Sequence, residues 1–309
     1  MAHFAIHPEP EAYSSSPMVS PLNVGLIGAG PWARMVTGPV LAAGPQTRVA
    51  GVWSRTAEHA SELAAQLETD AFDSVDSLLE SCDAVAIAVA PSAQPELAIH
   101  AARAGKALLL EKPLAVDVAG AQSIVDAVNA AGVGAVVMLS NRFNDAVDEF
   151  AAAARRVDAY GGRGCFFSGA FLGGPFAQGW RLERGAVLDV GPHLLDLLEV
   201  ALGPIVDVRA AGDPLGLVAL ICRHELGAVS SASLCCRAAT ESRTEIEVYG
   251  PKGSAVYDGR MIDHRLWADR VRLTLVAAAR GETPAASVQR GLHLQRLIAD
   301  IESQLGAAS

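Results

Sequence analysis

The sequence predicts an α/β protein with an N-terminal doubly wound parallel sheet and a C-terminal α/β domain built on an open, mainly antiparallel sheet. The length of 309 residues suggests two domains. Short apolar runs alternate with helical patterns over residues 22–139, which is typical of a parallel sheet. After residue 140, strand-like runs follow one another without helices between them. We therefore expect a disordered tail over 1–20, a first domain over 21–141 and a second over 142–309.

The apolar runs of the first domain are almost continuously hydrophobic, as expected for strands buried on both faces. Thr56 is a suitable residue for a helix start, and Gly105 and Gly132 are suitable stops. The expected strands are 23–27, 48–53, 84–89, 107–110 and 134–139, and the expected helices are 32–41, 56–67, 94–104 and 117–130.

The second domain has a different rhythm. Glu245-Ile246-Glu247-Val248 alternates strictly, so one face of its sheet is wet or meets a partner. The expected elements are helices at 144–156, 188–202 and about 288–305, strands at 217–222, 228–236 and 244–249, and glycine-rich segments at 161–164 and 173–179.

Composition excludes several classes of protein. The formal net charge is −10 and there is no basic run, so nucleic acid and anionic membranes are poor partners. Five cysteines without C-x-x-C spacing argue against disulfides and zinc, and we expect reduced thiols in a cytoplasmic protein with no metal site. Residues 1–20 lack the apolar stretch of a secretory signal, and no window approaches the roughly 20 apolar residues of a membrane span.

A glycine turn follows the first expected strand. Gly28 permits a tight turn, Gly30 lets the backbone approach a pyrophosphate, and Ala33 is small enough for close packing of helix and strand. The following helix directs its N-terminus at the phosphates, and we include Pro31 and Trp32 in the cofactor site. Between a strand and a helix, this turn predicts dinucleotide binding.

The end of the second expected strand bears on the choice of cofactor. NAD sites usually carry Asp or Glu there, but this chain has Ser54 and Arg55. Because both side chains suit a 2′-phosphate, the sequence favours NADP over NAD. The alternative is that Arg55 is simply an exposed residue at a helix start.

Lys112 lies in Glu111-Lys112-Pro113, directly after the fourth expected strand. Because the carboxyl ends of parallel strands open onto one crevice, its ammonium should lie beside the bound dinucleotide, where it suits chemistry that develops an alkoxide. Pro113 favours an extended Lys112. The alternative is an ordinary surface lysine. Glu111 and Lys112, with Ala90 and Pro91 after the third strand, complete the expected cofactor site.

Asp189 and His193 are four residues apart and share a face if both are helical. A helix that begins near Leu188 would place Pro192 in its first turn, where proline is tolerated. Histidine suits proton transfer near neutral pH. A first-turn position would lower its pKa, and Asp189 would act the other way and could orient the ring. The alternative is a capping Asp189 and a satisfied, semi-buried His193.

Four segments, 24–30, 104–114, 188–196 and 248–253, together resemble the Gfo/Idh/MocA oxidoreductases, the glucose-fructose oxidoreductase and inositol dehydrogenase family. The resemblance implies a Rossmann domain, then a domain whose open sheet often forms a homo-oligomer, here a dimer or tetramer. It also implies NAD(P)-dependent oxidation or reduction of a sugar, cyclitol or related small molecule.

Lys112, Asp189 and His193 match the three positions of the catalytic group in that family. The chain departs from the family pattern at Pro95, where many members carry histidine, and at Arg184-Gly185, which replaces a common Gly-Gly pair.

These expectations give a mechanistic hypothesis. A hydride passes between nicotinamide and a carbinol carbon, His193 transfers the hydroxyl proton, Lys112 stabilises the partial alkoxide and Asp189 orients or relays. Two other functions stay open: a dinucleotide-binding sensor or regulator without turnover, and a redox-cycling lyase or glycosidase. The candidate substrate residues, which could equally be packing at the rim, are Arg142, Trp180 and Arg181.

Overall fold

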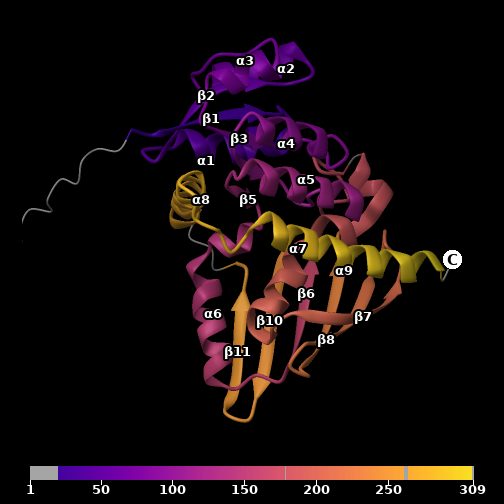
Figure 1. Cartoon of the computed structure of the whole chain (residues 1–309). Coiled ribbons are helices and arrows are strands. Elements are labelled where there is room, and N and C mark those ends of the chain that lie inside the picture. The colour runs from indigo at the N-terminus through magenta and orange to yellow at the C-terminus, as the bar shows by residue number, and fades with distance from the viewer. Residues whose placement is uncertain (1–19, 178, 261–263, 308–309) are drawn as a thin grey trace, which may run out of the picture.

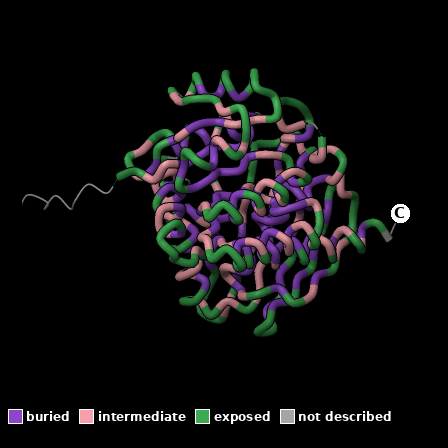
Figure 2. Tube along the Cα trace, turned by 45° about the horizontal axis from the view of Figure 1, so that its top comes forward, coloured by how far each residue is buried: buried purple, intermediate pink, exposed green. Residues whose placement is uncertain are grey.

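The computed structural model describes residues 20–177, 179–260 and 264–307, which form two sheets with helices packed on and between them (Figure 1). The tail expected over 1–20 lies outside the described residues apart from Ser20. Buried positions concentrate in the interior, and exposed positions follow the outer turns (Figure 2).

The first sheet is parallel throughout and has the order β2-β1-β3-β4-β5, as the alternation of strands and helices predicts. All residues of β3 and β4 are buried, which explains their unbroken apolar sequence. Strand order reverses at β1, where chains of this type bind ligands at the carboxyl edge. The strands are β1 (Leu22–Ile27), β2 (Thr47–Trp53), β3 (Ala84–Ile87), β4 (Ala107–Leu110) and β5 (Ala135–Val137).

The predicted helix signals of this domain are confirmed. Thr56 is the extended N-cap residue of α2, and Gly132 ends α5 with φ of 64°. A short helix, α3, was not predicted; Ser74 caps it by accepting from the amide of Ser77 at 3.1 Å. The helices are α2 (Ala57–Gln66), α3 (Val75–Glu80), α4 (Gln94–Arg103) and α5 (Val118–Ala131).

The helix after β1 is irregular. It consists of a π-helical turn, η1 (Ala33–Thr37), followed by α1 (Gly38–Ala42). Pro39 has no amide hydrogen to donate, and the amide of Gly38 reaches back to the carbonyl of Ala33. The predicted helix over 32–41 is therefore present, with a wider turn in its first half.

The second sheet has the order β11-β10-β6-β9-β8-β7. Only β6 and β9 pair in parallel among these strands, so the predicted open and mainly antiparallel sheet is confirmed. Strands β6, β7 and β11 were not predicted. The strands are β6 (Gly161–Phe167), β7 (Ile205–Gly212), β8 (Val218–His224), β9 (Val229–Cys235), β10 (Arg243–Gly250) and β11 (Gly253–Asp258).

Helices cover one face of the second sheet. α6 (Asp145–Arg156), α7 (Trp180–Leu202) and α9 (Val288–Ala307) pack there, and the short η2 (Ser140–Phe143) links β5 to α6. α8 (His264–Ala279), which was not predicted, returns to the first sheet and packs on β4, β5 and α1. None of the helices in the described ranges has the length and hydrophobicity to cross a bilayer.

The helix that carries Asp189 and His193 starts earlier than predicted. α7 begins at Trp180 and is broken at Gly185, whose φ is 78°. A Cβ at Gly185 would lie 2.0 Å from the carbonyl oxygen of Pro214, so only glycine fits. Because the helix resumes directly after Gly185, the prediction that Pro192 falls in a first turn is wrong: Pro192 lies inside the helix.

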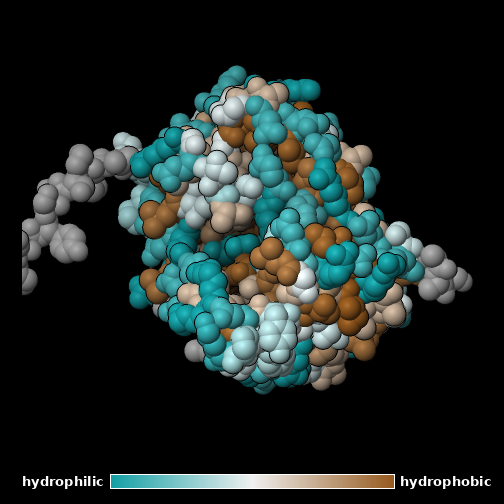
Figure 3. Space-filling model, turned by 60° about the horizontal axis from the view of Figure 1, so that its bottom comes forward, coloured by the Kyte–Doolittle hydropathy of each residue, from teal (hydrophilic) through white to brown (hydrophobic). Residues whose placement is uncertain are grey.

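The surface is mixed in character. On the face shown in Figure 3, hydrophilic residues cover most of the surface. That face is hollowed near its centre, and hydrophobic residues gather beside the hollow.

Candidate active site

The glycine turn lies where β1 and β3 meet. Gly28 has φ of 111°, its amide donates to the carbonyl of Trp53 at 2.8 Å, and a Cβ on it would lie 2.3 Å from the carbonyl oxygen of Ala88. This close approach admits only glycine. Gly30 is exposed, and a Cβ there would meet no atom within 4 Å, so the space beside the turn is open. The residues present fit a pyrophosphate at this turn.

The other residues expected on the cofactor side follow the carboxyl ends of neighbouring strands. Ser54 is half-buried and Arg55 is exposed, directly after β2. Ala90 is exposed and Pro91 is buried, after β3. Pro31 and Trp32, both half-buried, begin the helix after the glycine turn. The structure thus brings these residues to one edge of the first sheet.

A buried amide fixes the segment after β4. The Nε2 atom of Gln94 donates to the carbonyl oxygens of Glu111, Pro113 and Leu114 at 2.7, 3.2 and 3.0 Å. Its Oε1 atom accepts from the amide of Glu111 at 3.0 Å. Gln94 is therefore a positioning residue for Lys112, and sequence reasoning missed it because a lone glutamine at a helix start carries no signal.

Lys112 joins the two domains. Its Nζ atom donates to the carbonyl oxygen of Asp189 at 2.7 Å and to Oδ1 of the same residue at 3.0 Å. Arg181 approaches the other carboxylate oxygen, with Nε 3.4 Å from Oδ2. Burial acts to raise the pKa of Asp189, but these two cations together hold it below its ordinary value. Asp189 is therefore an ionised carboxylate with both oxygens engaged.

His193 lies on the same helix and is 7% exposed. Its Nδ1 atom is buried and has no hydrogen-bond partner among the described residues, and its ring stacks on Phe166 with centroids 6.2 Å apart. Burial and the charge of Lys112 lower the pKa of His193 to about 3, against the opposing effect of Asp189. The imidazole is therefore neutral at neutral pH.

This buried, neutral histidine predicts a loss of stability in acid. In the unfolded chain His193 takes up a proton below its ordinary pKa of 6.5, whereas the folded chain resists this down to about 3. The unfolded state binds more protons between these values, so the free energy of unfolding falls as the pH drops, by about 1.4 kcal/mol per pH unit. Between pH 7 and 5, the wild type should lose about 2 kcal/mol more than His193→Asn in urea denaturation. Equal losses in the two proteins would contradict a buried, neutral His193.

Glu111 points into the first domain. Its carboxylate accepts from the hydroxyl of Thr37 at 3.3 Å. Burial raises the pKa of Glu111 to about 7, although Lys112 acts to lower it. Glu111 therefore contacts the helix that follows the glycine turn and carries only part of a charge near neutral pH.

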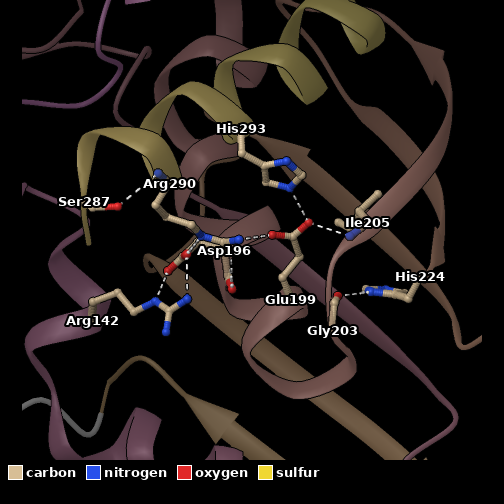
Figure 4. Close-up of polar contacts among 9 residues, drawn as sticks. All are labelled: Arg142, Asp196, Glu199, Gly203, Ile205, His224, Ser287, Arg290 and His293. Carbon is tan, nitrogen blue, oxygen red and sulfur yellow. Dashed lines mark hydrogen bonds and ion pairs between the residues drawn. The ribbon is translucent and has the colours of Figure 1, made fainter. Parts of the chain in front are cut away.

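A buried network of charges holds α7 in place (Figure 4). Asp196, one turn after His193, accepts from Arg142 Nε at 2.7 Å and Nη2 at 3.0 Å, and from Arg290 Nε at 2.7 Å. Arg290 also pairs with Glu199, which accepts from His293 Nε2 at 2.7 Å. These contacts tie α7 to η2 and to α9, so the network positions the helix that carries Asp189 and His193.

The three expected substrate residues differ in their surroundings. The guanidinium of Arg142 is committed to Asp196 through two hydrogen bonds. Arg181 reaches Asp189, and Trp180 lies under the guanidinium of Arg181, 4.5 Å from it to the ring centroid. The structure therefore brings Arg181 and Trp180 to Asp189 and places Arg142 in the charge network around Asp196. Within the described ranges, no cluster of three or more His, Cys, Asp or Glu could hold a metal.

Comparison with known proteins gives matches in both domains. The family model described as the oxidoreductase family with an NAD-binding Rossmann fold matches residues 22–139. The GFO/IDH/MocA C-terminal domain matches residues 167–256.

Characterised relatives match parts of the chain. UDP-N-acetylglucosamine 3-dehydrogenase of Acidithiobacillus ferrooxidans is 36% identical over 104 residues, which are 34% of this chain and 32% of that protein. The 1,5-anhydro-D-fructose reductase of Ensifer adhaerens is 33% identical over 192 residues, 58% of this chain and 56% of that protein. Each match spans less than two thirds of the relative's own length.

Solved structures match almost the whole chain. Levoglucosan dehydrogenase, in complex with NADH and L-sorbose, superimposes with a TM-score of 0.83 at 20% identity, covering 94% of this chain and 98% of that one. The A. ferrooxidans dehydrogenase gives a TM-score of 0.81 at 22% identity over 93% of this chain and 98% of that one. The fold is thus shared over both domains, and with the two matching family models it shows that the chain belongs to the GFO/IDH/MocA oxidoreductase family.

Proposed function

We propose that this chain is an NAD(P)-dependent oxidoreductase that moves a hydride between nicotinamide and a carbinol or carbonyl carbon of a sugar, cyclitol or related small molecule. One observation carries the proposal. Lys112, from the edge that bears the glycine turn, donates to Asp189 of the second domain at 3.0 Å, and the unpartnered Nδ1 of His193 lies one helical turn further along. A dinucleotide bound at the glycine turn would place its nicotinamide ring, which carries the hydride, beside Lys112, Asp189 and His193.

Each residue has a role that follows from its charge. His193, neutral at pH 7, accepts the hydroxyl proton during oxidation and returns it during reduction. The Lys112 ammonium donates to the substrate oxygen and stabilises the negative charge that develops there. Asp189, ionised and paired on both oxygens, holds Lys112 and Arg181 in place.

NADP is the preferred cofactor in this proposal. Arg55 is exposed immediately after β2, no carboxylate stands at that strand end, and a guanidinium suits a 2′-phosphate. We expect Arg55→Ala to raise the KM for NADP by about 10-fold or more and to change the KM for NAD much less. Arg103→Ala, at an exposed arginine in the last turn of α4, is the matched control. A wild-type protein that binds NAD but not NADP in a thermal-shift titration would contradict the preference for NADP.

The proposed activity is tested by following the absorbance of the reduced cofactor. The relatives' names indicate the panel: UDP-N-acetylglucosamine, D-apiose, and 1,5-anhydro-D-fructose with its reduced form, supplemented by inositols and simple aldoses. Stoichiometric cofactor conversion with at least one compound supports the proposal. Binding of NADP without steady-state conversion of any compound would instead favour a sensor or a redox-cycling lyase.

We also propose that a second copy covers the open face of the second sheet, in a dimer or tetramer. Three hydrophobic side chains on that face, Ile221, Val229 and Val256, are each at least half exposed.

The five cysteines are free, the usual state in a reducing compartment, which supports a cytoplasmic location.

A further inference from the structure

Arg181 is a second cation at the catalytic group. Its Nε lies 3.4 Å from Oδ2 of Asp189, while Lys112 occupies Oδ1 at 3.0 Å. Its side chain is 21% exposed, so it lies at the border between the buried group and solvent. The structure shows no hydrogen bond from either Nη atom of Arg181 to the described residues. Its fork of donors is therefore available to a ligand.

Aromatic rings fix the direction of this guanidinium. It lies over the ring of Trp180 at 4.5 Å and over that of Phe176 at 5.4 Å, measured to the centroids. Phe176 in turn meets Trp32 of the first domain edge to face, with centroids 6.0 Å apart. A guanidinium held by two rings and a carboxylate loses little conformational entropy when it binds a ligand.

The charges at this site do not balance. One carboxylate, Asp189, faces two cations, and His193 is neutral. Glu111 offsets the excess only in part, because its buried carboxyl contacts Thr37 and its pKa is raised to about 7. Charges that are largely removed from water are normally paired, so this site lacks one negative group.

Other arginines close to the site in the fold have their own partners. Arg142 is paired with Asp196, and Arg184 donates to Glu302 at 2.8 Å and to the carbonyl of Val116 at 3.2 Å. Arg142 shares Asp196 with Arg290, but Arg290 also pairs with Glu199, so two carboxylates balance two arginines there. Asp189, by contrast, pairs with both Lys112 and Arg181. The excess positive charge is therefore located at Arg181.

We propose that Arg181 binds an oxyanion carried by the substrate, so that the enzyme acts on an anionic polyol. The anion is either a carboxylate, as in a uronic acid or other sugar acid, or a phosphate, as in a sugar phosphate or nucleotide-linked sugar. Both present two oxygens that match the fork of a guanidinium. This inference rests on the proposed function and narrows its substrate class.

The test compares charged and neutral sugars. The anionic probes are D-glucuronate, D-galacturonate, D-glucose 6-phosphate and UDP-glucose, and the neutral probes are D-glucose and D-galactose, all at one ionic strength with saturating NADP or NAD. Calorimetric titration gives Kd for each, and cofactor absorbance gives kcat/KM where turnover occurs. We expect the wild type to bind at least one anionic probe about 10-fold or more tightly than its neutral counterpart. The carboxylate and phosphate arms identify which oxyanion is recognised.

Variants assign this discrimination to Arg181. Arg181→Gln should bring the ratio of anionic to neutral affinity close to one, even if the variant binds both kinds of probe more weakly than the wild type. Arg181→Lys should retain part of the preference for anionic probes. Arg184→Gln, which removes the neighbouring arginine that is paired with Glu302, should retain the full ratio. Melting curves establish that each variant is folded.

The outcomes separate the two proposals. A wild type that prefers no anionic probe, or an Arg181→Gln variant that keeps the preference, overturns the assignment of Arg181. If such a protein still oxidises neutral sugars, the oxidoreductase proposal stands. Selective binding of anions that depends on Arg181, without turnover of any probe, supports the assignment and counts against the oxidoreductase.

Discussion

Replacing His193 with alanine is expected to lower kcat by about 10²–10⁴-fold, the usual contribution of a positioned acid–base group. The imidazole is buried, neutral and unpartnered at Nδ1, so the variant loses the proton acceptor and leaves space in its place. Steady-state rates with a compound from the substrate panel measure the effect. Because the glycine turn follows β1 of the first sheet and His193 lies on α7 of the second domain, the affinity for NADP should change little.

His100→Ala is the control for this experiment. His100 is exposed on α4 and its ring pairs with the surface carboxylate of Asp76, so its loss should leave kcat unchanged. His193→Asn, which fills more of the space, should lose nearly as much activity as His193→Ala. Full kcat in either His193 variant, with cofactor bound, would remove His193 from the mechanism.

Replacing Lys112 with methionine is expected to lower kcat/KM by about 10²–10³-fold, as losing one donor to a developing oxyanion typically does. The ammonium donates to two atoms of Asp189 and stands between the cofactor edge and the second domain. Methionine keeps the length of the side chain and removes its charge. Asp189 would lose the ammonium of Lys112 and keep the guanidinium of Arg181 as its neighbouring cation, so the pKa of Asp189 should rise. A pH titration of the variant would detect this rise.

Lys106→Met provides the comparison. Lys106 precedes β4, and its Nζ donates to the carbonyl of Cys82 at 2.9 Å, on the opposite edge of the sheet from Lys112. Its loss should affect stability modestly and kcat/KM not at all. Lys112→Arg keeps the charge, but its planar fork cannot reproduce the compact ammonium, so partial activity at most is expected. Unaltered kcat/KM in Lys112→Met would show that Lys112 is not the group that stabilises the alkoxide.

The first domain could be predicted from sequence because its strands are buried on both faces. Each reads as a short apolar run, and strand–helix alternation with short connections admits few other folds. The second domain was only partly predictable. Strand β6 reads as a glycine-rich loop, yet its glycines serve close packing: a Cβ on Gly164 would lie 2.6 Å from Ile246 Cδ1 and 3.0 Å from Leu194 Cδ1. Such contacts between distant segments leave no local pattern.

The start of α7 could not be predicted for a similar reason. A glycine next to a helical pattern suggests an end, and Gly185 does interrupt the helix, but the segment from Trp180 is helical as well. What permits the interruption is the carbonyl of Pro214 packed against Gly185. With the helix resuming before Leu188, the low pKa of His193 comes from burial and Lys112 rather than from a first-turn dipole.

The residues of the candidate site could be named from the sequence, but the contacts between them could not. Residue type and spacing left Lys112, Asp189 and His193 with ordinary structural alternatives, and it was the resemblance to the family that implied a common catalytic group. The pairing of Lys112 with Asp189 requires the two domains to meet. Arg142 illustrates the limit: it was named as a candidate substrate residue, but its carboxylate partner, Asp196, becomes visible only when α7 is in place. The clamp by Gln94 is equally invisible without coordinates.

A crystal structure of the chain with bound NADP tests the central claim most directly. We expect the pyrophosphate at Gly28 and Gly30, and the nicotinamide ring beside the Lys112 ammonium and the His193 imidazole, with room for one carbinol carbon among them. A nicotinamide directed away from Lys112, or an imidazole that faces solvent instead of the ring, would contradict it.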